Sequence, residues 1–443
     1  MPKIQSVGMV HLGCPKNQVN GERMLASLAE AGYTVMDPYD EPDAVIVNTC
    51  GFIDDAKREA IDTILEMADL KKEGLIKKVL VTGCLAEVYA DEVRKEIPEV
   101  DAVLGLGANA DIVSYLEQAE EEPVTAFPDK EQLPLGGERL RQGAKHWAYL
   151  SIAEGCSNRC AYCTIPAIRG PYRSRPQEEI LEEARALAAD GVKEVILIAQ
   201  DTTRYGSDLY GEYRLPGLLR ELCIIDSLKR IRLLYCYPDA VTDELIDTIA
   251  AEPKVCKYLD IPLQHINDGI LRAMNRRIDK AGILSLLSKL RERIPGIALR
   301  TTLLVGFPGE TEEAFAELCS FMAEQRFDHA GVFVFSPQEG TPAYDMPEQP
   351  EPEVAARRAE ILMEQQTQIM EALAAAKTGE TAEVIVDEYD GYADAYTGRT
   401  AGQAPDIDSV VLFTSPIDIP DGEIVRVTFV GTEGIDLMGR VAL

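Results

Sequence analysis

The stretch "EGCSNRCAYCTIPAIRG", Glu154 to Gly170, places three cysteines in one short loop. Cys156, Cys160 and Cys163 are separated by three and then two residues, with no fourth cysteine close by. A structural zinc site is closed by four protein ligands, whereas a site that binds a second molecule keeps one position open. Zinc would need a fourth ligand, and His146 is the only histidine near in the sequence. Three cysteines at this spacing instead match a 4Fe–4S cluster with one open iron.

The loop belongs to a predicted core domain, residues 142–377, in which strand-like runs alternate with helical patterns. Such alternation is typical of parallel β/α structure. Six strands predict an open or partial (β/α) barrel, in which the loops after the strands carry the chemistry. The strand candidates are "WAYLSIAEGC", "EVILIAQD", "RIRLLYCYP", "YLDIPLQH", "IALRTTLLVGFPG" and "HAGVFVFSP".

Two further domains and a linker are expected around this core, in keeping with 443 residues at roughly 100–200 per domain. Residues 1–118 alternate β-branched runs with amphipathic helical stretches, which predicts a doubly wound α/β domain. The acidic, proline-bearing segment 119–141 lacks periodicity and is expected to be a linker. Residues 378–443 form short strands broken by Gly, Pro and Asp, a pattern typical of a small antiparallel β-barrel.

A second group of cysteines, Cys14, Cys50 and Cys84, is spread over the first domain. Each one ends a predicted parallel strand, in "VHLGC", "VIVNTC" and "VLVTGC". A lone cysteine is more often a small buried residue, but the strand ends of a doubly wound sheet face one crevice where ligands bind. We therefore expect the three thiols to hold a second iron–sulfur cluster. The remaining cysteines lack matching partners and are expected to be packing residues: Cys223, Cys236, Cys256 and Cys319.

The composition is that of a globular protein, with 46% hydrophobic and 27% charged residues. No apolar run approaches the roughly 18 residues of a membrane helix, and the N-terminus lacks a signal-peptide pattern, so we expect a cytoplasmic protein. Ten cysteines are too few for a disulfide scaffold in a chain of this length. A net charge of −31 disfavours a general nucleic-acid binder and suits attraction of a basic partner.

The Cys-x3-Cys-x2-Cys pattern, with Tyr162 before its last cysteine, resembles the radical S-adenosylmethionine superfamily. In that superfamily the open iron is chelated by S-adenosylmethionine, and the aromatic residue lies beside the adenine. Two three-cysteine sites, a radical core and a terminal barrel together resemble the methylthiotransferases over essentially all 443 residues. The resemblance implies two 4Fe–4S clusters, S-adenosylmethionine as cofactor and a C-terminal TRAM barrel.

The methylthiotransferase family has two main bacterial branches with different targets. RimO-like enzymes modify an aspartate of the twelfth protein of the small ribosomal subunit, and MiaB-like enzymes modify an isopentenylated adenosine beside the tRNA anticodon. The chain resembles the RimO-like branch in "HLGCPKN", "NTCGFI", "AIRGPYRSR", "AQDTTRYG" and "YLDIPLQH". It departs from the family pattern at Asn20 and Gly21, where an acidic and a serine residue are usual, although Glu22 is retained.

Charge favours the same branch. Residues 378–443 contain 13 acidic residues and 3 arginines, a formal charge of −10. A barrel that holds RNA should be basic, because neutralised phosphates dominate such binding. An acidic surface instead suits a basic ribosomal protein, by orienting it and speeding its encounter. We therefore expect no direct RNA binding.

The resemblance implies reductive cleavage of S-adenosylmethionine at the cluster on Cys156, Cys160 and Cys163. The resulting 5′-deoxyadenosyl radical removes a β-carbon hydrogen that no side-chain base can take. The second cluster presents the sulfur, which a further S-adenosylmethionine methylates, and the product is 3-methylthioaspartate. Cofactor contacts are expected, with ordinary loop and barrel packing as the alternative, at Tyr162, Gln200, Gly306 and Gly309. Carboxylate binding, with a solvated basic surface as the alternative, is expected at Arg169, Arg173 and Arg175.

Two other functions stay open from the sequence. One is a tRNA methylthiotransferase, which the motifs and the acidic barrel disfavour. The other is an electron-transfer or cluster-carrier protein, which does not need so large a barrel core. The expected partners are the ribosomal protein or the assembled ribosome and a reductant such as flavodoxin or ferredoxin, and we expect the protein itself to be a monomer.

Overall fold

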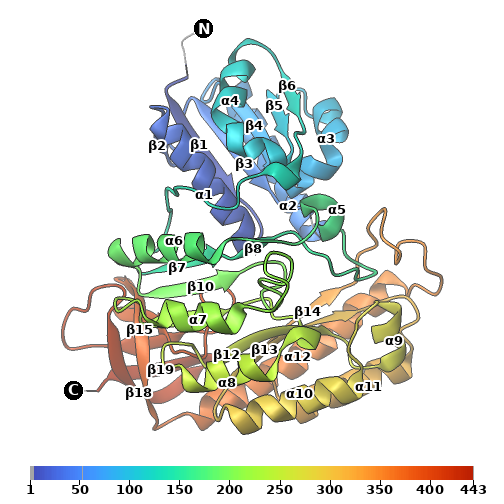
Figure 1. Cartoon of the computed structure of the whole chain (residues 1–443), viewed down its shortest axis with the longest axis vertical. Coiled ribbons are helices and arrows are strands. Elements are labelled where there is room, and N and C mark those ends of the chain that lie inside the picture. The colour runs from blue at the N-terminus through green and yellow to red at the C-terminus, as the bar shows by residue number, and fades with distance from the viewer. Residues whose placement is uncertain (1–3, 52, 443) are drawn as a thin grey trace. The chain divides into compact units, whose positions relative to one another are not determined.

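A computed structural model describes residues 4–51 and 53–442, which form two compact units (Figure 1). The N-terminal unit contains the chain up to Gly143 together with residues 153–158 and 164–175. The C-terminal unit contains residues 144–152, 159–163 and 176 onwards. None of the described helices is long and apolar enough to cross a membrane.

The N-terminal unit is built on a parallel sheet of order β2-β1-β3-β4-β5-β6. Its strands are β1 (Ser6–His11), β2 (Thr34–Met36), β3 (Ala44–Thr49), β4 (Lys78–Gly83), β5 (Ala102–Leu104) and β6 (Val124–Ala126). Its helices are α1 (Pro15–Glu30), α2 (Asp54–Lys72), α3 (Cys84–Glu96) and α4 (Ile112–Glu121). Helices α1 and α4 pack on one face and α2 and α3 on the other, so the predicted doubly wound domain is confirmed.

Burial explains the hydrophobic runs of this sheet. All six residues of β3 are buried, as expected for a strand covered by helices on both faces. Alternate residues point to opposite faces, so Ile46 packs with Leu25 of α1, whereas Val45 packs with Ile64 of α2.

The segment expected to be a linker, residues 119–141, begins inside this unit, since α4 ends at Glu121 and β6 pairs with β5. β6 has three residues, too few to show a period in the sequence.

The core of the C-terminal unit is a partial barrel of parallel strands, as predicted. The pairings run β7-β10-β11 and β12-β13-β14, and the Cys236 N–H joins the two sets by donating to the Asp260 carbonyl at 2.8 Å. The strands are β7 (Trp147–Ser151), β10 (Glu194–Ile198), β11 (Arg230–Leu233), β12 (Tyr258–Gln264), β13 (Ala298–Val305) and β14 (His329–Val334). The helices are α6 (Gln177–Ala189), α7 (Leu215–Cys223), α8 (Asp243–Ala251), α9 (Asp268–Ala273), α10 (Lys280–Arg293), α11 (Glu312–Gln325) and α12 (Pro352–Ala376).

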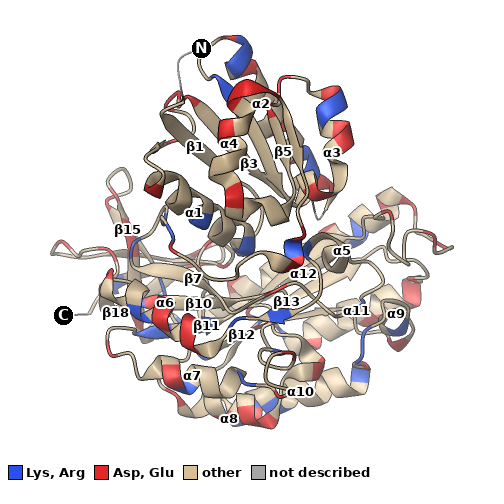
Figure 2. Cartoon of the chain, turned by 45° about the horizontal axis from the view of Figure 1, so that its top comes forward, with Lys and Arg blue, Asp and Glu red and all other residues tan. Residues whose placement is uncertain are grey.

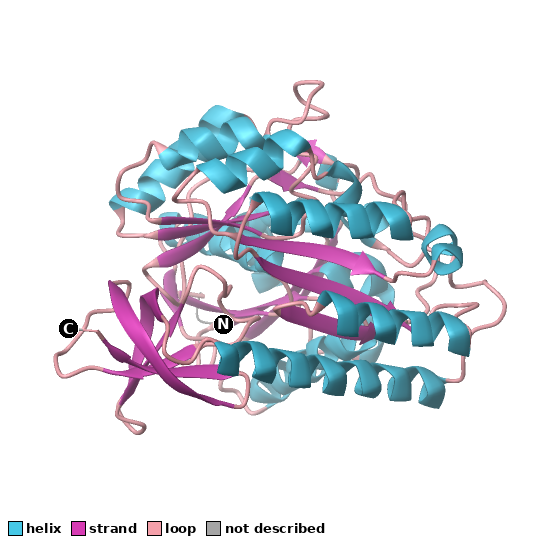
Figure 3. Cartoon of the chain, turned by 90° about the horizontal axis from the view of Figure 1, so that it is seen from below, coloured by secondary structure: helices cyan, strands magenta, loops and turns pink. Residues whose placement is uncertain are grey.

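The C-terminal strands close into the predicted small barrel, seen beside the C-terminus in Figure 3. They are β15 (Thr381–Asp390), β16 (Ala395–Arg399), β17 (Val411–Thr414), β18 (Ile424–Glu433) and β19 (Asp436–Val441). Among the described residues four of the five pairings are antiparallel, and the pairing of β17 with β19 is parallel. The barrel interior is filled by apolar side chains such as Val384, Phe413 and Phe429.

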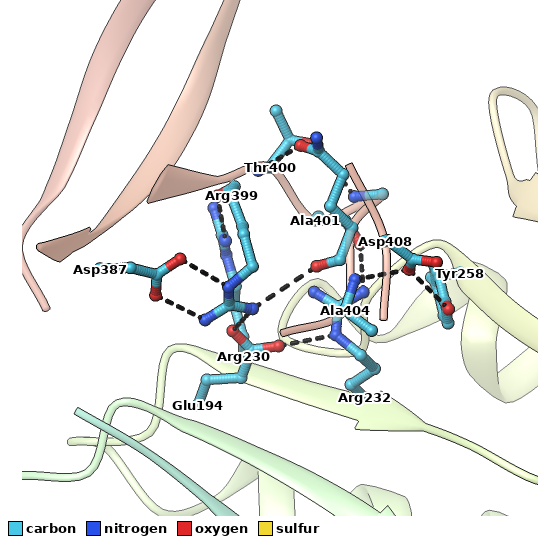
Figure 4. Close-up of polar contacts among 12 residues, drawn as sticks. Glu194, Arg230, Arg232, Tyr258, Asp387, Arg399, Thr400, Ala401, Ala404 and Asp408 are labelled. Atoms are coloured by element: carbon cyan, nitrogen blue, oxygen red, sulfur yellow. Dashed lines mark hydrogen bonds and ion pairs between the residues drawn. The ribbon is translucent and has the colours of Figure 1, made fainter. Parts of the chain in front are cut away.

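A buried network of charged side chains joins the barrel to the core (Figure 4). Glu194, the first residue of β10, accepts hydrogen bonds from Arg232 at 2.7 Å and from Arg399 of the barrel at 3.0 Å. Arg399 also donates to Asp387 of the barrel at 2.7 and 2.9 Å. Burial works to raise the pKa of Glu194, but Arg232 and the neighbouring arginines outweigh it and lower that pKa to about 2.

The contacts with the barrel start from the amino ends of the core strands. Arg230, the first residue of β11, donates to the Glu383 carbonyl at 3.0 Å, and Tyr258, the first of β12, donates to Asp408 at 2.8 Å. Active sites of parallel β/α folds lie at the other end, on the loops that follow the strands. The barrel therefore covers the end of the core that is opposite to the expected chemistry.

Candidate functional site

Cys14, Cys50 and Cys84 lie where three neighbouring strands of the N-terminal sheet end. Cys14 follows β1 as the N-cap of α1, Cys50 follows β3, and Cys84 follows β4 as the first residue of α3. Because β1, β3 and β4 are adjacent in the sheet, these ends share one edge. The strand order also reverses between β1 and β3, which is where doubly wound folds bind their ligands.

Two glycines let these loops approach one another closely. Gly13 has φ +86°, a conformation that favours glycine, and a Cβ there would lie 2.6 Å from the Cβ of Cys50. A Cβ at Gly51 would lie 2.9 Å from the backbone of Leu85 in the first turn of α3. The loop before α1 therefore touches the end of β3, and the loop after β3 touches the start of α3.

A buried arginine lies beside this group. Arg169 ends α5 (Ile165–Arg169), is only 3% exposed, and places its Nη2 3.5 Å from the Cys84 sulfur and 2.6 Å from Asn17 Oδ1. Its Nη1 donates to both carboxylate oxygens of Glu154, at 3.0 and 3.1 Å. A nearby cation and a helix N-terminus both stabilise a thiolate, and Cys84 has both.

The surroundings act differently on two of the thiols. Burial works to raise the pKa of Cys14, but Lys16, Arg169 and backbone N–H groups outweigh it, so that pKa lies below its ordinary value. Burial raises the pKa of the Cys84 thiol, and Arg169 offsets only part of this rise. Arg169 thus favours the thiolate, the form that binds metal, at both positions.

The donor set is three cysteine thiols, the usual ligands of iron–sulfur clusters. In the part of the chain that the structure describes, no three His, Cys, Asp or Glu side chains are grouped so as to hold one metal ion. In a 4Fe–4S cluster the thiolates bind separate iron atoms, so their sulfurs stand further apart than ligands of one ion. Three thiols at one sheet edge, with a buried guanidinium and the N-termini of α1 and α3, suit such an anionic group.

The loop with the other three cysteines contributes to both compact units, with Cys156 in the N-terminal unit and Cys160 and Cys163 in the C-terminal unit. In the N-terminal unit, Cys156 follows β8 (Ala153–Glu154), and its N–H donates to the Gly170 carbonyl at 3.1 Å. In the C-terminal unit, the Cys163 N–H donates to the Cys160 carbonyl at 3.2 Å, which closes a tight turn.

Two side chains that the sequence analysis missed contact Cys160. Its sulfur lies 3.0 Å from the hydroxyl of Tyr237 and 3.8 Å from Nη1 of Arg276. The Arg276 guanidinium also stacks on the Tyr237 ring, 3.9 Å from its centroid. Tyr237 follows β11, so this contact lies at the carboxyl end of the core strands. The sequence run "RIRLLYCYP" could have indicated Tyr237. Residues in the loops just after the strands of a β/α barrel often belong to the active site.

The residues predicted to contact the cofactor all lie in the C-terminal unit. Tyr162 lies close enough to Arg276, Cys160 and Cys163 for electrostatic interaction with them. Its pKa is raised well above the usual value, chiefly by burial. Gln200 comes two residues after β10, and Gly309 lies in the loop after β13.

Gly306 has a structural role that the geometry explains. It has φ +73°, and a Cβ there would lie 2.5 Å from the Cβ of Ala355. Its N–H donates to Glu310 at 2.6 Å, and the buried Glu310 carboxylate also binds Arg358 at 2.9 Å and lies 3.2 Å from His265. A tight turn and close packing therefore require glycine at position 306 even without a cofactor.

The arginines after the cysteine loop do not form a solvated basic surface. Besides the buried Arg169, Arg173 donates to carbonyl oxygens of residues 130–133, and Arg175 is 1% exposed. Arg169 does bind a carboxylate, but it is that of Glu154 in the same unit.

Two cysteines without a predicted role, Cys236 and Cys256, are buried. The other two, Cys223 and Cys319, are partly exposed.

The glycine that departs from the family pattern makes room for a histidine. A Cβ at Gly21 would lie 2.0 Å from Cε1 of His11, so the His11 ring packs directly on the backbone of α1. The ring is held by Gln142 at 3.0 Å, and burial lowers its pKa. The retained Glu22 is buried and accepts a hydrogen bond from Arg139 Nε at 2.9 Å.

Comparison with known families matches three consecutive parts of the chain. Residues 6–105 match the Uncharacterized protein family UPF0004, residues 150–322 the Radical SAM superfamily, and residues 378–442 the TRAM domain. Among solved structures, the chain is similar to the radical S-adenosylmethionine methyltransferase TsrM from Kitasatospora setae, with a TM-score of 0.57 and 17% identity over 77% of both chains. A likeness at that identity supports the fold alone.

Curated relatives match the whole chain. "Ribosomal protein uS12 methylthiotransferase RimO" of Desulforamulus reducens is 48% identical over 99% of this chain and 99% of its own length. The proteins of the same name from Desulfitobacterium hafniense and Geobacter sulfurreducens are 45% and 47% identical, each over 99% of this chain and 98% of its own length. The chain therefore belongs to the RimO family of radical S-adenosylmethionine methylthiotransferases.

Proposed function

We propose that this chain transfers a methylthio group to the β-carbon of an aspartate in ribosomal protein uS12. The observation that carries the proposal is the end-to-end similarity to relatives named for that activity, at 45–48% identity. The relatives are matched over almost their whole length, so every domain that the activity needs in them has a counterpart here.

We assign Cys14, Cys50 and Cys84 to one 4Fe–4S cluster, and the cysteines at 156, 160 and 163 to a second that leaves one iron open for S-adenosylmethionine. When bound, these groups supply the 5′-deoxyadenosyl radical and the sulfur, chemistry that amino-acid side chains lack. The chain's part is to hold both groups and the target in register, because correct orientation removes much of the entropic barrier.

Individual side chains have narrower roles in this proposal. Arg169 donates a hydrogen bond to the Cys84 sulfur and is itself paired with the Glu154 carboxylate. Tyr237 and Arg276 donate hydrogen bonds to the Cys160 sulfur and so fix its position. For contacts with S-adenosylmethionine we propose Tyr162, Gln200, Gly306 and Gly309, which follow the strands of the core.

We also propose that the barrel attracts the basic ribosomal protein. Not every acidic residue of the barrel is available, because Asp387 binds Arg399 and Asp408 has no exposed side-chain surface. Exposed carboxylates remain at Glu388, Asp390, Asp418 and Asp421. Since the barrel covers the amino ends of the core strands, it serves as an anchor away from the reacting aspartate.

The electron donor in this proposal is a protein such as flavodoxin or ferredoxin, and the reaction takes place in the cytoplasm on a monomeric enzyme.

The proposal is tested by offering both family targets to one enzyme. The anaerobically reconstituted protein is incubated with S-adenosylmethionine, a reductant and either uS12 or isopentenylated tRNA, and both products are analysed by mass spectrometry. We expect a methylthio group in place of one hydrogen on uS12 and none on the tRNA. Modification of the tRNA alone would move the chain to the tRNA branch.

A further inference from the structure

A hollow of about 450 Å³ opens on the surface of the C-terminal unit beside α9. It is lined by Asp268, Leu271, Arg272, Arg276, Arg277, Ile278 and Asp279. Three of these residues are arginines in a chain whose net charge is −31. The loop between α9 and α10 is correspondingly drawn partly in blue in Figure 2, where red marks the acidic residues of many other helices.

The arginines of this hollow are available to a partner. Arg272 and Arg277 are exposed, and neither side chain makes a hydrogen bond or ion pair with the residues that the structure describes. Arg159, next to Cys160, is also exposed, and its carbonyl accepts a hydrogen bond from Asn275 in the same loop as Arg277. Exposed guanidinium groups without partners are the usual means of binding a carboxylate-rich surface.

The carboxylates in the hollow are already engaged. Asp268 accepts a hydrogen bond from the Lys280 N–H at 2.7 Å, and Asp279 accepts one from the Gly282 N–H at 2.8 Å as the N-cap of α10. They satisfy backbone donors of the helix start, and two carboxylates against three arginines leave the lining of the hollow with a formal charge of +1. The hollow is therefore a positive area on a negative protein.

The same hollow leads directly to a cysteine of the radical loop. Arg276 lines it and is 7% exposed, yet Nη1 of Arg276 lies 3.8 Å from the Cys160 sulfur. Its guanidinium also stacks on Tyr237, whose hydroxyl lies 3.0 Å from that sulfur. A molecule seated in the hollow is thus separated from Cys160 by one side chain. Electron transfer falls steeply with distance, so this is a short entry path.

From this juxtaposition we propose that the arginine-lined hollow is the docking surface for an acidic protein that carries one electron at a time. The inference rests on the proposed function, in which Cys160 holds the cluster that is reduced. On docking, the carrier is oxidised by one electron and the cluster on Cys156, Cys160 and Cys163 is reduced by one. Charge attraction brings the two proteins together although both are acidic overall, because local complementarity governs the encounter.

RNA is the other polyanion that fits a basic hollow, and the observations favour the carrier. Proximity to Cys160 does not strengthen RNA binding, whereas it is needed for electron transfer. The hollow also has too few cationic side chains to neutralise a long phosphate chain. RNA binding is therefore made an outcome of the test.

The test compares two charge-reversed variants of the anaerobically reconstituted full chain. The first is Arg272→Glu with Arg277→Glu, and Arg276 is left intact because it contacts Cys160. The matched control is Arg185→Glu with Arg357→Glu, which reverses two exposed arginines on α6 and α12. The first readout is the dissociation constant for oxidised flavodoxin, measured by calorimetry over a salt series. A second titration uses a single-stranded ribosomal RNA fragment.

We expect the hollow variant to bind flavodoxin about tenfold or more weakly at low salt and to lose most of its salt dependence, while the control changes little. The second readout is the ratio of S-adenosylmethionine cleavage driven by reduced flavodoxin to cleavage driven by reduced methyl viologen, a small cationic donor. That ratio should fall in the hollow variant alone. Equal flavodoxin affinities in both variants, or a loss of RNA affinity alone, would overturn the inference. If the unaltered protein cleaves nothing with methyl viologen, the proposed function fails instead.

Discussion

The two cysteine groups are distributed differently along the chain. Cys14, Cys50 and Cys84 come from three separate strands of one sheet, so only the folded sheet brings them to one edge. Cys156, Cys160 and Cys163 lie within one short loop, so their proximity is mostly a property of the local chain. The first site depends on long-range packing, whereas the second depends on a loop that the strands merely position.

The charges beside the two groups also differ. Arg169 lies 3.5 Å from Cys84 and is neutralised by Glu154, so the pair adds no net charge. Arg276 lies 3.8 Å from Cys160 and has no carboxylate partner among the described residues, since it stacks on Tyr237 and donates to the Pro262 carbonyl. The group proposed to accept an electron thus keeps an uncompensated positive charge beside it. The group proposed to deliver sulfur does not.

The largest expected effect comes from removing the loop cysteines. Replacing Cys156, Cys160 and Cys163 with alanine should abolish S-adenosylmethionine cleavage and remove about half of the bound iron, because cluster ligation needs the thiolates. Iron analysis and quantification of 5′-deoxyadenosine check this. The matched control replaces Cys223 and Cys319, which have no assigned role, and should retain both iron and cleavage. If 5′-deoxyadenosine still formed in the triple variant, the assignment of the radical site would be wrong.

A large loss of stability is expected at the neutralised arginine of the first site. Arg169→Gln removes the guanidinium that is paired with the buried Glu154, and breaking a buried ion pair typically costs about 3–5 kcal/mol. Urea unfolding measures the loss, and Arg173→Gln is the control, because Arg173 donates only to carbonyl oxygens in the same region. Replacing both partners, as Arg169→Met with Glu154→Leu, should restore most of the stability but not the iron content of the first site. Full iron in that double variant would mean that Arg169 does not support the cluster.

A smaller effect, confined to stability, is expected at the interface between barrel and core. Glu194→Gln should lower the free energy of unfolding by about 3 kcal/mol at neutral pH. Iron content and cleavage should not change, since Glu194 begins β10, at the end of the core opposite to the proposed site. The pKa of Glu194 is lowered from 4.5 to about 2, so its ionised form stabilises the folded state above pH 4.5. That contribution is lost as the pH falls from 4.5 towards 2. Chemical unfolding across this range should therefore show the difference between the two proteins shrinking, and a constant difference would contradict the assignment.

The sequence predicted what depends on local pattern or on the ends of strands. Cys14, Cys50 and Cys84 could be placed at one edge because each ends a β-branched run. Parallel strands run in the same direction, so their carboxyl ends lie at the same edge of the sheet. The six core strands and the short strands of the barrel followed from alternation and from turn residues. These features are read from short windows, so no long-range contact is needed to find them.

Side-chain partners that are distant in sequence could not be found in this way. Asn17 contacts Arg169 across 152 residues, and Arg276 meets Cys160 across 116. Asp387 looked like one of many surface carboxylates, yet it binds Arg399 and His146 at the interface with the core. A count of charges predicts the sign of a surface, but which charges face inward depends on how two domains pack.

The division of labour between the two sites is tested most directly by one measurement on the first group. The variant with Cys14, Cys50 and Cys84 replaced by alanine is reacted with uS12, S-adenosylmethionine and a reductant. 5′-Deoxyadenosine and methylthioaspartate are then quantified in the same sample. Because a cluster can contribute folding energy, thermal unfolding and the iron content of the loop site are measured alongside. Our account predicts that 5′-deoxyadenosine forms while methylthioaspartate does not. Methylthioaspartate made by this variant would contradict the account.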